Sequence, residues 1–271
     1  MSHSSIPSPG LGTYRVTDHD TCVETIQTAI DTGYRHIDTA EAYGNEAAVG
    51  AALDEASVDR EELFLATKVF HPKFTEAYSP DSFEENVRAC LDRLGVDRVD
   101  LLYAIHWPEG EYDPEATFER AAGLANEGLF DRLGVCNMTP ELVDEAREAS
   151  PMPITAVQVE MHPLLPQRAL RSYCAQQDLD LVAYAPLGNG RMLEVPELTD
   201  IADAHGVSPA RVSIAWALEK GVVPIPKATT REHIVDNFRA RELALTDAEI
   251  ERIDAIGRTD RQYDPGYAPA W

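Results

Sequence analysis

The feature that most constrains the fold is a regular alternation of short apolar segments with longer amphipathic segments along the chain. Such alternation favours a parallel sheet covered by helices. Strands are predicted at Tyr34–Asp38, Leu63–Val69, Asp100–His106, Arg132–Cys136, Ala156–Glu160, Leu181–Ala185 and Val222–Pro226. Helices are predicted at Glu46–Ala56, Asp81–Leu94, Pro114–Asn126, Pro140–Ala149, Gln167–Gln177, Val195–His205 and Pro209–Lys220.

The length of the chain narrows the fold class further. The chain has 271 residues, close to the roughly 250 residues typical of a (β/α)8 barrel. An open doubly wound sheet is the alternative. We predict an α/β fold, a (β/α)8 TIM barrel of parallel strands that forms a single domain over residues 1–271. The eighth strand is expected either at Val235–Arg239 or before Asp20.

Residues that begin and end helices support these boundaries. Asp81, with Glu84 three residues later, has the pattern of a capping box. Thr139 and Ser208 are each followed by proline, the pattern of an N-cap with proline at the first helical position. Gly221 is expected to end the helix that Ser208 begins.

The net charge of the chain argues against a nucleic-acid partner and suggests an environment of high salt. The formal net charge is −24, from 47 acidic and 23 basic residues. Because phosphate contacts need Lys and Arg, no nucleic-acid partner is expected. Repulsion on this scale is screened at about 1 M salt, where the Debye length is about 3 Å. We therefore predict a halophilic protein, with an ordinary acidic enzyme as the alternative. Lysine remains at only four positions, Lys68, Lys73, Lys220 and Lys227.

The sequence contains no pattern typical of export, membrane insertion or a metal site. No run approaches the roughly 18 apolar residues of a membrane span, and Met1–Gly10 lacks the pattern of a secretory signal. We expect a cytoplasmic protein with no membrane partner, no bound metal and reduced thiols. The cysteines are widely separated and form no C-x-x-C pair, at Cys22, Cys90, Cys136 and Cys174.

Four side chains follow apolar runs and suggest a chemistry. Asp38, Lys68 and His106 each end or follow a predicted strand, and Tyr43 lies five residues after Asp38. Catalytic residues of barrels gather at the carboxyl ends of the strands, so these side chains are expected to meet. The alternative for each residue is a structural role, as an ion pair, a packing tyrosine or a turn histidine.

This set of groups can protonate a carbonyl oxygen. Tyrosine has an ordinary pKa near 10, and a neighbouring ammonium such as that of Lys68 would lower this pKa. Asp38 would hold Lys68 charged, and His106 would orient the carbonyl. Side chains supply no hydride, so a reduced cofactor is required. The glycine-rich segments at Gly10–Gly12 and Gly188–Gly190 do not form G-x-G-x-x-G, which argues against an open nucleotide-binding sheet.

The sequence motifs around these residues resemble those of the aldo-keto reductase family. Within the family, they are most similar in form to the motifs of the prokaryotic diketogluconate reductases. The resemblance runs in family order over nearly the whole chain. It is carried by GYRHIDTAEAYGNE at 33–46, ATKV at 66–69, IHWP at 105–108, GVCN at 134–137, VQVEMHP at 157–163, AYAPLG at 183–188 and IPK at 225–227.

The resemblance implies a barrel that binds NADPH or NADH without a Rossmann fold, and it implies the four roles suggested above: Tyr43 as general acid, Lys68 and Asp38 as its tuning pair, and His106 as the group that orients the carbonyl. By this resemblance Asn137 and Gln158 hold the nicotinamide carboxamide and Tyr184 stacks on the ring. Lys227, His233, Asp236 and Asn237 correspond to positions that bind the adenosine phosphate and the adenine. Substrate contacts are expected from Tyr14, Phe70, Trp107 and His106.

Departures from the family pattern fall at both ends of the cofactor. Cys136 stands where serine is usual, and a thiol is a weak hydrogen-bonding group. Ala228 and His233 replace a serine and an arginine. Imidazole is mostly neutral at pH 7 and lacks the arginine fork that suits phosphate. We therefore expect a weakened preference for NADPH, with Arg231 as a nearby cation that would compensate in part.

The predicted function is NAD(P)H-dependent reduction of aldehydes, ketoaldehydes or keto-sugars, small carbonyl compounds, to alcohols. Two alternatives remain: a sugar or alcohol dehydrogenase working in the oxidative direction, and a nicotinamide-binding sensor or scaffold without catalysis. The family makes a monomer the default expectation. In the tail, Tyr263, Tyr267 or Trp271 is expected to touch the substrate, with a disordered surface tail as the alternative.

Overall fold

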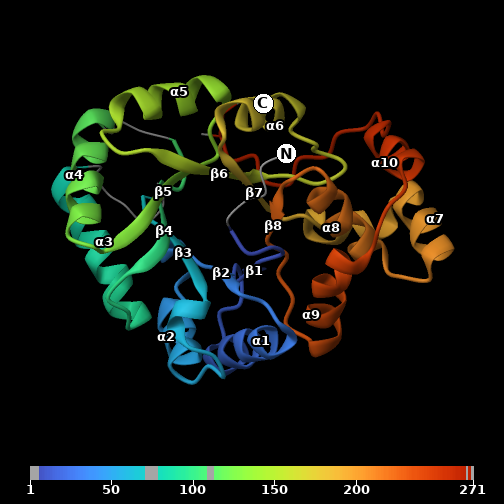
Figure 1. Cartoon of the computed structure of the whole chain (residues 1–271), viewed down its shortest axis with the longest axis horizontal. Helices are drawn as coiled ribbons and strands as arrows, with labels where there is room; N and C mark the ends of the chain where they lie inside the picture. Colours follow the sequence, from blue (N-terminus) through green and yellow to red (C-terminus); the bar gives the residue numbers. More distant parts are fainter. Residues whose placement is uncertain (1–5, 71–78, 109–112, 267, 270–271) are drawn as a thin grey trace.

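The computed structural model describes residues 6–70, 79–108, 113–266 and 268–269. Within these residues, eight parallel strands pair in chain order, as the sequence predicted for a (β/α)8 barrel (Figure 1). The strands are β1 (Leu11–Gly12), β2 (His36–Asp38), β3 (Phe64–Lys68), β4 (Val99–Ile105), β5 (Phe130–Cys136), β6 (Ile154–Glu160), β7 (Asp180–Tyr184) and β8 (Val223–Pro224).

The first and last strands close the sheet into a barrel. The backbone N–H of Gly10 donates to the carbonyl of Pro224 (3.0 Å), and that of Gly12 donates to the carbonyl of Pro226 (3.1 Å). Glycine is needed at this seam, since a Cβ on Gly12 would lie 2.8 Å from the carbonyl oxygen of Ile225. The Gly10–Gly12 segment is therefore a closing strand. The strand that could not be located from the sequence is thus β1, and it lies before Asp20, as one of the two alternatives predicted.

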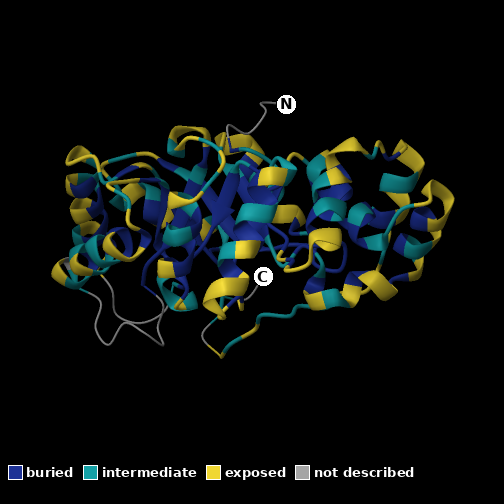
Figure 2. Ribbon diagram, turned by 90° about the horizontal axis from the view of Figure 1, so that it is seen from below, coloured by how far each residue is buried: buried dark blue, intermediate teal, exposed yellow. Residues whose placement is uncertain are grey.

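Helices surround the sheet on its outer side (Figure 1), and their exposed residues face away from the buried strands (Figure 2). The helices are α1 (His19–Thr32), α2 (Glu46–Asp54), α3 (Pro80–Leu94), α4 (Pro114–Asn126), α5 (Pro140–Ala149), α6 (Arg168–Gln177), α7 (Pro196–His205), α8 (Pro209–Glu219), α9 (Arg231–Phe238) and α10 (Asp247–Asp254). Because α9 covers residues 231–238, the alternative of a strand at Val235–Arg239 was wrong.

Most of the predicted helix ends are confirmed. The Thr139 side chain accepts from the N–H of Leu142, and that of Ser208 accepts from the N–H of Arg211. Gly221 follows the end of α8 with a φ of 70°. The predicted capping box at Asp81 was wrong, because α3 begins one residue earlier and Ser79 caps it through Ser82.

The barrel interior forms a small core of its own, separate from the larger apolar layer between strands and helices. Ile6 and Ile225 belong to this inner core, together with Tyr103 and Val182. His36 on β2 is also fully buried, with its ring 5.2 Å from that of Phe64. Burial lowers the pKa of His36 to about 4. An apolar floor therefore lies beneath the polar groups at the strand ends.

Candidate active site

Successive strand ends bring a buried ion pair together. Asp38 is the last residue of β2, and Lys68 is the last residue of β3. Lys68 Nζ lies 2.5 Å from Asp38 Oδ1 and donates to the carbonyl of Thr39 at 2.8 Å. Both side chains are 1% exposed. Two charges so deeply buried are stable only when paired and hydrogen-bonded, and these contacts meet that requirement.

Tyr43 and His106 lie above this pair. Tyr43 ends a single 3-10 turn, η1 (Glu41–Tyr43), that follows β2. Lys68 Nζ is 5.1 Å from the centroid of the Tyr43 ring. His106 directly follows β4, and its ring is 6.0 Å from that of Tyr43 at an angle of 72°. The structure therefore brings together all four residues that the sequence singled out for proton transfer.

The pKa of Tyr43 differs in direction from the sequence-based expectation. Burial raises this pKa well above its usual value near 10, and the negative charge of Asp38 raises it further. The expected lowering of this pKa was wrong in direction, because the cost of burying a charged phenolate outweighs the stabilisation that a nearby ammonium offers. The phenol therefore stays protonated, which is the form that a proton donor must have.

Two amide side chains extend the site along the sheet. Gln158, on β6, donates from Nε2 to Asp38 Oδ2 at 2.8 Å. Asn137, directly after β5, donates from Nδ2 to the carbonyl of His106 (2.8 Å) and accepts from the Tyr184 hydroxyl (2.8 Å). Tyr184 ends β7. The first bond joins β6 to the buried ion pair, and the others join the ends of β4, β5 and β7. The backbone N–H of Asn137 donates to the carbonyl of Gln158 at 2.9 Å and connects the two groups.

Three of the turns that leave the strands place a residue other than glycine in the left-handed region. Phe70, Asn137 and Ala185 have φ values of 56°, 57° and 47°. Asparagine tolerates this left-handed region, but phenylalanine and alanine seldom adopt it. Each residue follows a group of the site, Lys68, Cys136 or Tyr184, by one or two positions. Strain of this kind tends to gather at functional sites.

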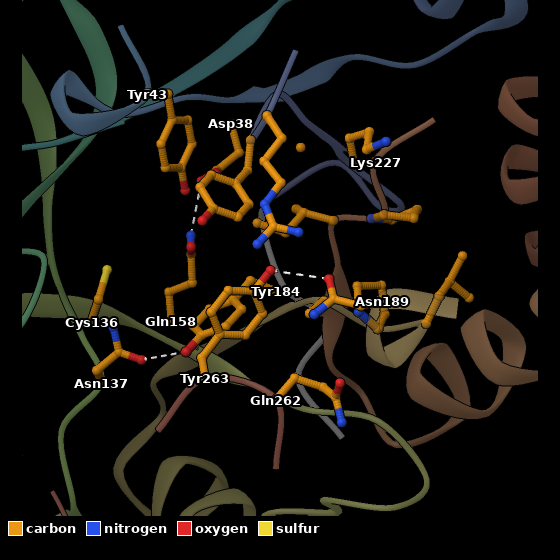
Figure 3. Close-up of a pocket in the computed structure, with 18 of the residues that line it drawn as sticks. Asp38, Tyr43, Cys136, Asn137, Gln158, Tyr184, Asn189, Lys227, Gln262 and Tyr263 are labelled. Atoms are coloured by element: carbon orange, nitrogen blue, oxygen red, sulfur yellow. Dashed lines mark hydrogen bonds between the residues drawn. The ribbon is translucent and has the colours of Figure 1, made fainter. Parts of the chain in front are cut away.

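Most of the strand-end groups, though not Lys68 or Phe70, line a cavity of about 790 Å³ (Figure 3). Asp38 and Tyr43 lie toward one end, and Lys227 lies toward the other (Figure 3). His106 lies beside Tyr43, with their rings 6.0 Å apart. The lining residues are Gly12, Tyr14, Arg15, Asp38, Ala42, Tyr43, His106, Trp107, Cys136, Asn137, Gln158, Tyr184, Ala185, Pro186, Leu187, Asn189, Gly190, Ile225, Pro226, Lys227, Gln262, Tyr263, Asp264 and Pro265.

The predicted adenosine-binding residues are only partly in the cavity. Lys227 lines it and is exposed, whereas His233, in the exposed first turn of α9, does not line it. Asp236 is engaged within the chain, because it accepts from Arg211 Nε (3.0 Å) and from the Ser208 hydroxyl. Asn237 is buried. The roles of His233, Asp236 and Asn237 therefore remain predictions.

Of the predicted substrate-binding residues, some line the cavity and one does not. Tyr14 and Trp107 line the cavity, and the Tyr14 ring is 5.1 Å from that of Tyr43. Phe70 is fully buried, packs against Phe83 at 5.4 Å and is not among the lining residues. A strained turn after β3 carries Phe70 into the core, so the structure gives it a packing role.

Sequence reasoning missed part of the lining. Arg15 carries a cation into the cavity wall from a left-handed position, with a φ of 64°. Asn189, in the 3-10 segment η3 (Gly188–Glu194), also lines the cavity. Tyr263 was one of three candidates from the tail for contact with substrate; it lines the cavity, and the contact itself stays a prediction. Tyr267 and Trp271 lie outside the described residues.

Other expectations about the chemistry of the chain can be compared with the structure. Cys136 is buried at the cavity wall, and burial raises the pKa of its thiol well above the ordinary value. The four cysteines are free, as predicted. Among the described residues, no cluster of His, Cys, Asp or Glu is arranged to hold a metal ion, and no helix has the length and apolarity needed to cross a bilayer.

A closed parallel barrel with a buried Asp–Lys pair beneath a tyrosine and a histidine defines a class of barrel oxidoreductases. Residues 10–258 match the model of the aldo/keto reductase family. The chain belongs to this family, whose members reduce carbonyl compounds. Family membership implies a nicotinamide cofactor.

Relatives with assigned activities share almost the whole chain. Glyoxal reductase of Bacillus subtilis is 35% identical over 261 residues, covering 96% of this chain and 92% of that protein. Methylglyoxal reductase DkgB of Escherichia coli O157:H7 is 35% identical over 271 residues, covering 98% and 99%. A crystal structure of a protein provisionally named 2,5-diketo-D-gluconic acid reductase B has a TM-score of 0.93 and 31% identity, covering 100% and 98%.

Proposed function

We propose that this protein reduces small aldehydes, ketoaldehydes or keto-sugars to alcohols with a reduced nicotinamide cofactor, and that Tyr43 is the proton donor. The observation that carries the proposal is the buried Asp38–Lys68 pair, 2.5 Å apart, beneath the ring of Tyr43. The family and its glyoxal- and methylglyoxal-reducing relatives support the substrate class.

Proton delivery from Tyr43 is compatible with its raised pKa. A carbonyl whose carbon accepts a hydride becomes an alkoxide, and the alcohol that this alkoxide forms on protonation is a much weaker acid than a phenol. A phenol can therefore protonate the alkoxide even when burial raises the phenol's own pKa. Lys68 then stabilises the phenolate left behind, and Asp38 keeps Lys68 in place. His106 orients the carbonyl oxygen beside Tyr43.

The lining residues fit a nicotinamide cofactor in their chemistry. Asn137 and Gln158 offer amide groups to a carboxamide, and Tyr184 offers a flat ring that suits stacking. Arg15 and Lys227 bring positive charge to the cavity, as phosphate groups require. The reduced nicotinamide, when bound, supplies the hydride that side chains lack. The neutral thiol of Cys136 leaves most of the carboxamide binding to Asn137 and Gln158.

The preference between the two nicotinamide cofactors should be weak. Ala228 has no hydroxyl, and His233 is exposed and cannot form an arginine fork. We propose that NADH is accepted beside NADPH. A ratio of catalytic efficiencies above about 100 in favour of NADPH, about 2.7 kcal/mol, would contradict this.

A substrate panel tests the proposed function. Methylglyoxal, diketogluconate and a nitrobenzaldehyde should each be offered with NADPH and with NADH, at low and at molar salt. The parent is expected to oxidise cofactor, and Tyr43→Phe should lose about 10²–10⁴-fold in kcat. Turnover by Tyr43→Phe within about tenfold of the parent would show that another group donates the proton.

Two alternatives give other results in the same experiment. A sensor or scaffold would bind NADPH but show no turnover that depends on Tyr43. A physiological dehydrogenase would use the same residues in reverse, so it should oxidise alcohols or sugars with NAD⁺ or NADP⁺. The intact set of four catalytic groups favours an enzyme over a scaffold.

A further inference from the structure

A second buried carboxylate lies beside the site but outside the set used for proton transfer. Glu160 is the last residue of β6, two positions after Gln158, and its side chain is 0% exposed. Residues two apart on a strand point to the same side of the sheet. In the sheet Glu160 pairs with Tyr184 of β7. One strand end thus carries both a cavity amide and a buried acid.

The Glu160 carboxylate binds a segment from far along the chain. Its Oε1 accepts from the backbone N–H of Gln262 (2.7 Å), and its Oε2 accepts from that of Tyr263 (2.8 Å). His162 Nε2 lies 2.9 Å from Oε1. The N–H of Asp260 donates to the carbonyl of Leu164 at 3.0 Å. Together these bonds attach residues 260–263 to the barrel wall.

The attached segment places Tyr263 against the aromatic side of the cavity (Figure 3). The Tyr263 ring is 5.5 Å from that of Tyr184 and 6.0 Å from that of Tyr14. Its hydroxyl donates to Asn189 Oδ1 at 3.0 Å. Tyr14 in turn lies 5.1 Å from Tyr43. The position of Tyr263 therefore limits the space beside the proposed proton donor.

We propose that Glu160 is a positioning residue for substrate, which holds the cavity wall at Gln262–Pro265 in place from inside the barrel. The proposal rests on the proposed reductase function. A carboxylate suits this task because it offers two acceptor oxygens to two neighbouring N–H groups, and charge-assisted bonds are the stronger kind. An amide at the same place would turn its own NH₂ toward one of these donors.

Amide hydrogen exchange of Glu160→Gln tests the attachment directly. The amides of Gln262 and Tyr263 should exchange about tenfold faster or more, since one hydrogen bond to a charged group is lost. Strand amides of β4 and β5 should be unchanged. Asp100→Asn is the matched control, because it also changes a carboxylate that accepts a backbone N–H. Asp100 lies near the start of β4, away from the cavity, and its Oδ2 accepts from the N–H of Leu65 on β3.

Steady-state kinetics with 4-nitrobenzaldehyde and saturating NADPH test the consequence. In Glu160→Gln we expect KM for the aldehyde to rise about tenfold while kcat stays within about threefold. Should this variant fold poorly, Gln262→Pro removes the first donor with Glu160 intact and should shift KM in the same direction. Asp100→Asn should leave both constants near those of the parent.

Three results would overturn the proposal: unchanged exchange at Gln262 and Tyr263, faster exchange with unchanged KM, or a fall in kcat as large as that in kcat/KM. The last would mean that Glu160 acts through Gln158 and Asp38. If the parent itself shows no turnover that depends on Tyr43, the proposed function fails, while the exchange data still decide whether Glu160 holds the segment.

Discussion

The two ends of the cavity are built in opposite ways. At the inner end, Asp38, Lys68 and Gln158 are each about 1% exposed, and both Lys68 and Gln158 donate to the Asp38 carboxylate. At the outer end, Lys227 is exposed, and His233 lies outside the lining. The inner end is therefore organised before any ligand arrives. The outer end depends on surface charges, which are weaker, more mobile and sensitive to salt.

Breaking the inner ion pair should have the largest effect. Lys68→Met leaves the Asp38 carboxylate buried and unpaired, at a cost of about 3–5 kcal/mol in the free energy of unfolding. We also expect kcat to fall by about 10²–10⁴. Lys220→Met is the matched control, because Lys220 pairs with the partly exposed Asp254 at the same 2.5 Å. Urea unfolding of both variants provides the comparison, and equal losses would show that the inner pair is not special.

The buried His36, in the barrel interior beneath the inner end of the cavity, should make the free energy of unfolding depend on pH. His36 takes up a proton near pH 6.5 when unfolded, but only near pH 4 when folded. Between these values the unfolded state binds more protons, so the free energy of unfolding falls as pH falls, by roughly 3 kcal/mol in all.

His36→Leu should remove this part of the pH dependence, as measured by urea unfolding between about pH 7 and pH 4. His19→Gln serves as the control, because the His19 side chain is 61% exposed. If both variants keep the slope of the parent, other groups cause the acid sensitivity.

Restoring a cation at the outer end should change cofactor choice but not chemistry. His233→Arg is expected to raise the NADPH-to-NADH ratio of catalytic efficiencies about tenfold, by adding a guanidinium fork in the first turn of α9. His205→Arg adds the same charge on α7 and should leave the ratio unchanged. A ratio that does not respond to His233→Arg would place the adenosine phosphate elsewhere.

The smallest predicted effect is a difference in salt sensitivity between the two ends of the cavity. Raising KCl toward about 1 M screens exposed charges far more than buried pairs. The advantage of NADPH over NADH should shrink severalfold, while kcat at saturating cofactor holds. The melting temperature should rise by a few degrees as repulsion among the 47 acidic residues is screened. A melting temperature that is unchanged in dilute buffer would argue against the halophilic prediction.

Local signals in the sequence predicted most of the fold. Seven strands were located within about two residues, and proline after Thr139 and Ser208 marked two helix starts, because caps and apolar runs act within a few residues. The start of α3 was wrong because Ser79 and Asp81 carry similar capping signals. The closing strand at Leu11–Gly12 is two residues long, too short to show a pattern.

The inner end of the site was more predictable than its walls. Asp38, Lys68 and His106 follow directly from the strand ends, and Tyr43 from its short turn. Phe70 could not be placed from sequence, because its left-handed turn depends on packing around it. The pKa of Tyr43 was predicted in the wrong direction because the depth of burial is a tertiary property.

The seam between β1 and β8 has a consequence for the protein as it is being synthesised. Gly10 and Gly12 find their partners only when Pro224 and Pro226 emerge, roughly 200 residues later. At about 5–20 residues per second the ribosome needs about 10–40 s for that stretch. Until then the N–H groups of Gly10 and Gly12 lack these partners, and Lys227 has not yet been added to the chain. Closure of the barrel and the Lys227 end of the cavity therefore wait until β8 and the residues after it have been made.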